Sequence, residues 1–193
     1  MAYLIIILVM MGIISGLNIA FNPLYEWYVY IIATIIGVIV VIGIDGVVAS
    51  RIRHMPEKYF DYHKKVFKTS KTEYKFYKLI GVKKWKEHVP ELGMFTGFRK
   101  NKIANPKDPA YLSRYILEAC YGIIIHLWSV PFSFLIMLLD IKMYSGNSNL
   151  WLTVLLPVAI INAILIVLPA FILKYNLPKL VRLYEISNKK GEQ

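Results

Sequence analysis

The sequence predicts an all-α integral membrane protein with four transmembrane helices and a basic, partly interfacial helical segment between the second and third of them. Of its 193 residues, 57% are hydrophobic, and the mean hydropathy is +0.51, which is unusual for a soluble domain. An apolar run of about 20 residues is long enough to cross a hydrocarbon core of about 30 Å. The chain has four such runs, at 2–21, 27–49, 115–139 and 150–173.

The positive charge is confined to particular segments. The net charge of +11 comes from 23 Lys and Arg against 12 Asp and Glu, an excess that nucleic-acid-binding proteins also show. Its distribution favours a membrane topology instead. Sixteen basic residues lie between Arg51 and Lys107, five lie between Lys174 and Lys190, and Arg114 precedes the third span. The remaining basic residue, Lys142, lies in the short connection between the third and fourth apolar runs.

By the positive-inside rule, loops rich in lysine and arginine lie on the cytoplasmic side of the membrane. We expect a multi-pass protein of the cell membrane, with both termini cytoplasmic. The segment 50–113 and the tail 174–193 are then also cytoplasmic, whereas 22–26 and 140–149 are external. Because the external connections are short, the spans form two antiparallel hairpins, and we expect residues 1–193 to make a single membrane domain.

The first two spans carry few polar residues. The first has no basic residues ahead of it and no clear cleavage site, so we interpret it as a retained helix rather than a signal peptide. Asn18, and Asn162 in the fourth span, are expected to be hydrogen-bond partners between helices. Asp45 lies near the cytoplasmic end of the second span, where we expect an ion pair with Arg51, Arg53 or a lysine.

The segment between the second and third spans has two parts. Residues 59–80 mix aromatic residues and lysines, which favours an interfacial helix starting after Pro56, although a solvated basic helix is the alternative. Residues 83–109 are punctuated by proline and glycine. We expect this second part to lie over the mouth of the bundle and to supply cations and backbone amides to an anionic group.

The third span contains Glu118 and His126, and a charged group at membrane depth costs about 2.5–3.5 kcal/mol on insertion scales. Its polar and small residues fall within about 80° of one helical face; they are Tyr115, Glu118, Gly122, His126, Ser129 and Ser133. We therefore expect this stripe to face the protein interior. Pro131 is expected to disturb the helix beside His126.

Two interpretations of this pair stay open. In the first, His126 is a general base acting on a hydroxyl, and Glu118 orients or relays. In the second, His126 is a neutral hydrogen-bond partner, and Glu118 pairs with Arg114 or a loop lysine near the interface. In both, the eight-residue separation of about 12 Å along the axis precludes a direct hydrogen bond. Cys120 lies about 120° around the helix from His126, which excludes a Cys–His pair.

No cofactor or metal is expected. The chain has no Walker, GxGxxG, HExxH or GxSxG motif, and its single cysteine, Cys120, excludes a cysteine-rich zinc site. His54, His63 and His88 lack convincing ligand spacing with an acidic partner.

Four patches together resemble the glycosyl-4,4'-diaponeurosporenoate acyltransferase family, small bacterial membrane proteins. The patches are MPEKYF (55–60), KKWKEHVPELG (83–93), the pair Glu118 and His126, and KYNLPKL (174–180). The resemblance implies transfer of an acyl group from an activated donor, a thioester or a phosphate, to a hydroxyl of a lipid or glycolipid acceptor. One position departs from the family pattern: Ile123 stands where the family can carry a second Glu.

The resemblance also implies site residues. Glu118 and His126 correspond to the catalytic acid and histidine, and the substrate-binding positions correspond to Lys84, Trp85, Lys86, Tyr175 and Asn176. Lys83, Lys100 and Lys102 are further candidates for holding an anionic head. The partners expected are an acyl donor, a lipid-linked acceptor and membrane lipids, without nucleic acid. Two other functions are compatible with the sequence. One is a non-catalytic protein that binds anionic lipid or a partner through its basic face, and the other is a small proton-linked transporter that uses Glu118 and Asp45.

Overall fold

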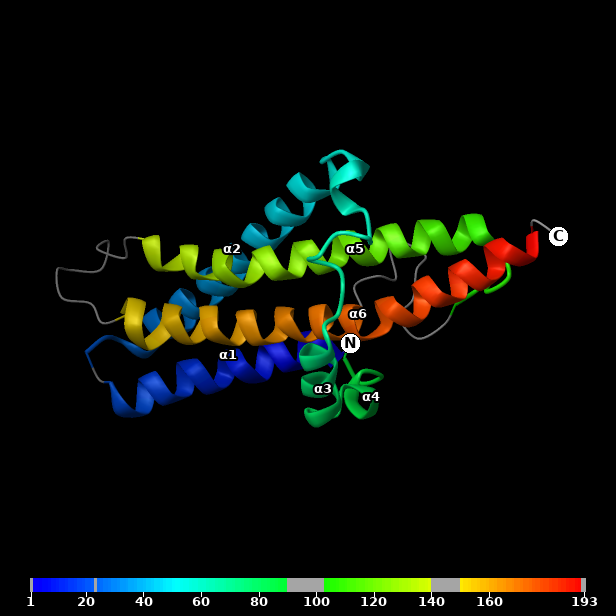
Figure 1. Cartoon of the computed structure of the whole chain (residues 1–193). Helices are drawn as coiled ribbons and strands as arrows, with labels where there is room; N and C mark the ends of the chain where they lie inside the picture. Colours follow the sequence, from blue (N-terminus) through cyan, green and yellow to red (C-terminus); the bar gives the residue numbers. More distant parts are fainter. Residues whose placement is uncertain (1, 23, 90–102, 140–149, 192–193) are drawn as a thin grey trace. The chain divides into compact units, whose positions relative to one another are not determined.

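The computed structural model describes residues 2–22, 24–89, 103–139 and 150–191 (Figure 1). The helices in chain order are α1 (Ala2–Phe21), α2 (Trp27–Arg53), the 3₁₀ helix η1 (Glu57–Phe60), α3 (Lys71–Leu79), α4 (Val82–Trp85), α5 (Pro109–Phe132), the 3₁₀ helix η3 (Ser133–Leu138), the π-helix η5 (Trp151–Leu155) and α6 (Leu156–Gly191). Within these ranges there is no β-strand. The predicted all-α class is confirmed.

In the part of the chain that the structure describes, four stretches of helix are long and apolar enough to cross a membrane, as predicted: Leu4–Phe21, Trp27–Arg53, Pro109–Leu138 and Trp151–Lys189. The second and fourth continue past the predicted ends, and the third begins before its predicted start. At 1.5 Å per residue, the 36 residues of α6 make about 54 Å of helix, against about 30 Å of hydrocarbon. Much of the segment placed in the tail is therefore a continuation of α6.

The prediction of one helix over 59–80 is wrong in its first half. Pro56 precedes only the short η1, and residues 61–70 run through turns before α3 begins. Ser70 starts α3 because its hydroxyl accepts a hydrogen bond from the backbone N–H of Glu73, while the Glu73 carboxylate accepts one from the N–H of Ser70. This reciprocal capping box satisfies two backbone donors that the first turn of a helix leaves without a partner.

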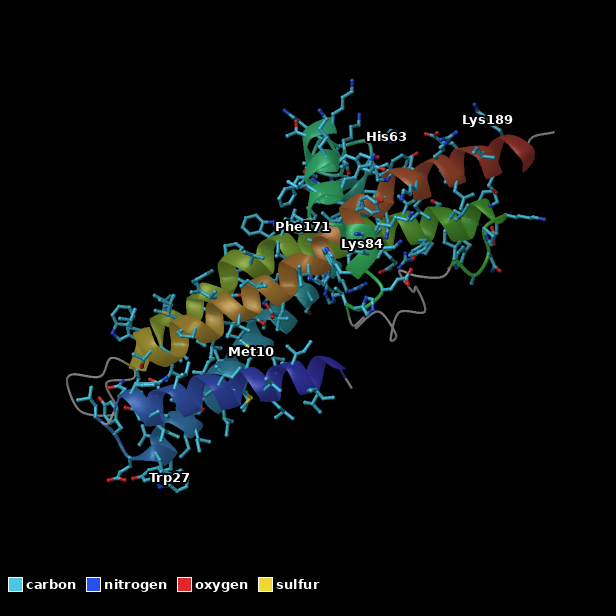
Figure 2. The ribbon with its side chains drawn as sticks, turned by 90° about the horizontal axis from the view of Figure 1, so that it is seen from below. Met10, Trp27, His63, Lys84, Phe171 and Lys189 are labelled. Carbon is cyan, nitrogen blue, oxygen red and sulfur yellow. The ribbon has the colours of Figure 1, made fainter. Side chains whose placement is uncertain are left out.

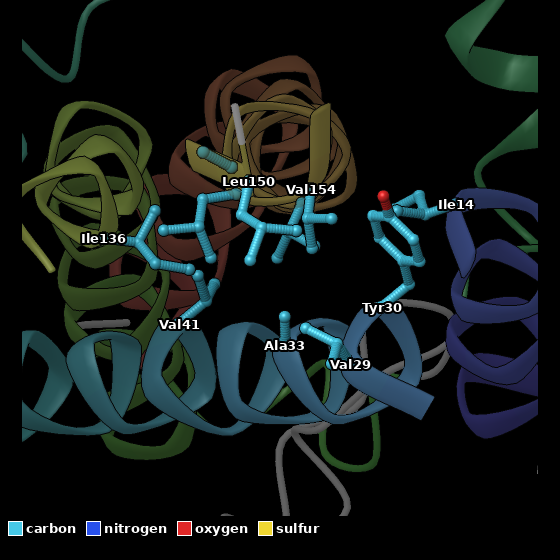
Figure 3. Close-up of a cluster of buried hydrophobic side chains, with 11 residues drawn as sticks. Ile14, Val29, Tyr30, Ala33, Val41, Ile136, Leu150 and Val154 are labelled. Carbon is cyan, nitrogen blue, oxygen red and sulfur yellow. The ribbon is translucent and has the colours of Figure 1, made fainter. Parts of the chain in front are cut away.

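The chain divides into two compact units, each with its own apolar contacts. The first unit comprises residues 1–50 and 128–166. Its core is built from buried side chains of α1, α2, η3, η5 and α6, among them Tyr30, Val41, Ile136, Leu150 and Val154 (Figure 3).

Several buried polar groups of the first unit are bonded between helices. Pro157 has no N–H, so it cannot donate to the carbonyl of Thr153 one turn earlier. The side-chain amide of Asn18 donates to this carbonyl at 2.9 Å and to the carbonyl of Ile14 at 2.8 Å. The hydroxyl of Ser15 donates to Thr34 at 3.1 Å. The interhelical role predicted for Asn18 is confirmed.

Asp45 also lies in the first unit, and its bond differs from the expected ion pair. The side-chain amide of Asn162 donates to Asp45 Oδ2 at 3.0 Å and to the hydroxyl of Ser133 at 2.9 Å. Arg53, one of the cations expected to pair with Asp45, is bonded to Glu118 instead. Asn162 thus joins α2, η3 and α6, as predicted for a polar residue inside a bundle.

The second unit comprises residues 51–127 and 167–193 and carries most of the charge. It contains twenty-two basic and nine acidic residues, a net charge of +13. Here α3 and α4 lie side by side (Figure 1). Their apolar faces and part of α6 form a core of Tyr77, Val82, Ile172 and Tyr175. Burial, with a smaller contribution from the charge of Glu73, raises the pKa of Tyr77 to about 12.

Candidate functional site

Glu118 is held by two arginines of the second unit. Its Oε2 accepts a hydrogen bond from Arg53 Nη1 and its Oε1 from Arg114 Nη2, both at 2.9 Å. The Glu118 side chain is only 9% exposed, whereas those of the arginines are 42% and 52% exposed. Arg114 also reaches the exposed Glu57 at 3.4 Å. Because both carboxylate oxygens are engaged, Glu118 is a fixed acceptor between two cations.

The pairing of Glu118 with Arg114 agrees with the second interpretation of the sequence, since residues four apart on a helix are neighbours. Arg53 was not among the partners proposed for Glu118. It lies 65 residues away along the chain, and no local pattern connects the end of α2 with α5.

The segment after α2 packs on α5 beside these charges. Phe60 is buried, and its ring lies 4.1 Å from the ring of Tyr121 between centroids. The guanidinium of Arg53 lies 6.0 Å from the same Tyr121 ring, within reach of a cation–π interaction. Aromatic packing therefore restricts Arg53 in addition to its bond with Glu118.

His126 lies two turns along α5 from Glu118 and is partly buried. Gly122 lies between them, one turn from each. A methyl group placed on Gly122 would come within 2.7 Å of Cδ1 of Leu173, so α6 approaches α5 closely here. The face of α5 between Glu118 and His126 is therefore bordered by an apolar side chain. Ile123, which follows Gly122, is fully buried.

The segment 174–180 of α6 anchors the start of α3. Pro178 has no N–H to donate to the carbonyl of Lys174, and the hydroxyl of Thr69 donates to that carbonyl at 2.8 Å. The ammonium of Lys174 binds Oε1 of Glu73. Tyr175 is buried, and its ring stacks on Tyr74 with 5.6 Å between centroids and a 7° angle between planes.

The comparisons with known proteins identify the family. The family model described as glycosyl-4,4'-diaponeurosporenoate acyltransferase matches residues 56–186, more than half of the chain. The chain belongs to this acyltransferase family. No curated protein matches it, and no solved structure does. The family predicted from the four patches is confirmed.

Two patches of the acyltransferase motif set meet in one cluster of the second unit. Trp85 of α4 packs against the core that contains Tyr175 of α6, and its indole N–H donates to the carbonyl of Ile80 at 2.8 Å. Phe171 of α6 also packs there, edge-to-face with Phe76 of α3 (Figure 2). Trp85 and Tyr175 thus have a packing role, and their binding of substrate stays a prediction.

The other predicted substrate-binding residues of this acyltransferase lie around the cluster. Lys84 is exposed on α4 (Figure 2), and Lys86, which ends that helix, is partly exposed. Asn176 is partly buried on α6, next to Tyr175. Lys100 and Lys102 lie outside the described residues, as do all of 90–102 in the segment expected over the bundle mouth.

Glu73 makes the docking of α3 dependent on pH. Burial opposes ionisation of its carboxyl, but the bonds from Lys174 and Ser70 outweigh burial and lower its pKa below the ordinary 4.5. A lowered carboxyl pKa stabilises the folded form above the unfolded pKa, and this contribution is lost as pH falls through the folded value. We therefore expect α3 to loosen from α6 only at pH below about 4.5.

Trp85 reports this change in a variant whose other tryptophans, Trp27, Trp128 and Trp151, are replaced by phenylalanine. Its fluorescence should shift to longer wavelength on acidification, because Trp85 packs in the same cluster as α3. In Glu73→Gln the acid transition should be weaker and the neutral-pH spectrum already partly shifted. An acid transition identical with and without this substitution would exclude Glu73 as the titrating group.

Proposed function

We propose that this acyltransferase moves a fatty acyl group from an activated donor to a hydroxyl of a lipid or glycolipid acceptor, with His126 as general base. The observation that carries the proposal is the family match over 56–186. That range includes Glu118 and His126 of α5 and the cluster in which the 83–93 and 174–180 patches meet. The donor is an acyl thioester or acyl phosphate.

The proposed reaction needs one proton carrier. The imidazole of His126 accepts the proton of the acceptor hydroxyl as its oxygen attacks the acyl carbonyl carbon. The new C–O ester bond forms, and the bond from the carbonyl carbon to the sulfur or phosphate oxygen of the donor breaks. The protonated imidazole can return its proton to the leaving group. The net change is exchange of the acyl group between donor and acceptor, without oxidation or reduction.

The hydrogen bonds of Glu118 determine the role that we propose for this residue. Both oxygens of its carboxylate are bonded to arginines, so Glu118 acts here as a positioning residue rather than as a relay. Lys84, Lys86 and Asn176 are proposed to contact substrate, since they lie exposed or partly exposed around the Trp85–Tyr175 cluster. In this proposal the site faces the cytoplasm, and the chain is a single membrane domain of the cell membrane with both termini cytoplasmic.

The test is acyl transfer by purified protein in lipid nanodiscs. Palmitoyl-coenzyme A and palmitoyl phosphate are supplied in turn with glycolipid acceptors, and the products are analysed by mass spectrometry. We expect a species heavier by one acyl group and release of coenzyme A or phosphate in equal amount. The same species should disappear from cellular lipid extracts when the gene is deleted. Lipid profiles that are identical with and without the gene would contradict the proposal.

A further inference from the structure

Two arginines far apart in the sequence converge on one carboxylate. Arg53 ends α2, Arg114 lies in the second turn of α5, and both bind Glu118 at 2.9 Å. Each arginine carries five N–H donors. The bonds described use one nitrogen of Arg53 and two of Arg114, so donors remain on both guanidinium groups for a further acceptor.

The free sides of these guanidinium groups are accessible. About half of each arginine side chain is exposed, whereas the carboxylate between them is nearly covered. An incoming anion therefore meets the guanidinium groups rather than the Glu118 carboxylate, beside the exposed Glu57 carboxylate that lies 3.4 Å from Arg114. The surrounding unit carries a net charge of +13, which attracts anions over distances comparable to the Debye length, about 8 Å at physiological salt.

The two guanidinium groups are also fixed before any ligand arrives. Glu118 holds one nitrogen of each, and Arg53 lies over the ring of Tyr121, which packs on Phe60. A planar guanidinium presents paired donors that match the oxygens of a phosphate. Because their orientation is set by the fold, little side-chain entropy remains to be lost on binding.

We propose that Arg53 and Arg114, positioned by Glu118, bind a phosphate group of the acyl donor. This inference rests on the proposed function and deepens it. Coenzyme A thioesters carry phosphates at the far end of the pantetheine arm, and acyl phosphates carry one on the acyl carbon. Both donor classes therefore offer a phosphate, the group to which an arginine pair is suited. The role of Glu118 is then to hold the two arginines in place.

The test measures binding rather than turnover. Coenzyme A and inorganic pyrophosphate are titrated by calorimetry against the full-length protein, as wild type, Arg53→Gln and Arg114→Gln. We expect each substitution to weaken binding of both probes at least about tenfold, because a charge-assisted hydrogen bond is lost. Arg51→Gln is the matched control: Arg51 is exposed on the same helix, about 200° from Arg53, and its loss should change binding less than about twofold.

Lysine variants separate recognition from folding. Arg53→Lys and Arg114→Lys keep the charge but lose the paired donors, so they should show intermediate affinity at an unchanged melting temperature. Unchanged binding of both probes in the glutamine variants, with the protein folded, would overturn the proposal.

A lipid headgroup is the other source of phosphate, and a second arm tests it. Native mass spectrometry compares retention of phosphatidylglycerol from mixed nanodiscs by the same variants. Loss of phosphatidylglycerol with unaffected coenzyme A binding would overturn the donor site and assign the pair to lipid. Since binding needs no turnover, a protein that binds coenzyme A through these arginines but transfers no acyl group would contradict only the proposed function.

Discussion

Alanine at position 126 is expected to lower the rate of acyl transfer at least about 100-fold, because a positioned general base typically contributes factors of 10² to 10⁴. The residue is only partly buried, so its replacement should leave the melting temperature in detergent within a few degrees of wild type. The measurement is the initial rate of acyl transfer in nanodiscs, at a donor concentration that saturates the wild type.

Two control variants test whether the loss of activity comes from the loss of a base at position 126. His126→Gln keeps hydrogen-bonding capacity but cannot act as a base near neutral pH, so it should be as inactive as His126→Ala. Leu127→Ala changes the adjacent, exposed residue and should leave the rate nearly unaltered. Wild-type rates in both His126 variants would remove the proposed base and favour the interpretation in which the imidazole is a structural partner.

Alanine at position 175 is expected to destabilise the second unit by about 3 kcal/mol, since removal of a buried aromatic side chain typically costs about 3–5 kcal/mol. Tyr175 is only 4% exposed. Its ring stacks on Tyr74, and the ammonium of Lys179 lies 4.2 Å from its centroid. Chemical unfolding followed through Trp85 as the remaining tryptophan should show an earlier transition.

Tyr175→Phe is the matched variant for this residue. It keeps the ring and removes the hydroxyl, so stability should stay within about 0.5 kcal/mol of wild type. If Tyr175 binds substrate through its hydroxyl, Tyr175→Phe lowers acyl transfer although the protein remains stable. An unfolding transition of Tyr175→Ala that coincides with that of wild type would refute the packing role.

The fold was largely predictable because it depends on local composition. Apolar runs of sufficient length must become helices in a bilayer, where each backbone group needs a partner within its own segment. The interfacial prediction over 59–80 was less accurate. The aromatic and lysine content suggested a single helix, but Ser70 and Glu73 form a capping signature, S-x-x-E, that starts α3 only at Lys71. That signature is present in the sequence and predicts the start of α3 better than the aromatic and lysine content does.

The candidate site was predictable only where its contacts are local. The pair Arg114–Glu118 follows from a spacing of four residues on a helix. The bonds of Glu118 with Arg53 and of Lys174 with Glu73 join residues 65 and 101 positions apart. No periodicity in one sequence encodes such pairs, because they are decided by which surfaces of the folded helices meet. The roles of His126 and of the predicted substrate-binding residues stay predictions.

The prolines of the last helix have a consequence for how this family can vary. Where Pro178 removes a donor, the carbonyl of Lys174 accepts from Thr69, and where Pro157 does so, the carbonyl of Thr153 accepts from Asn18. These two prolines are therefore each coupled to a distant donor, whereas none is described for Pro169 of the same helix. In an alignment of relatives, position 178 should covary with position 69, and position 157 with position 18. A relative without the proline has a backbone N–H that can donate to the carbonyl, so it no longer needs the side-chain donor.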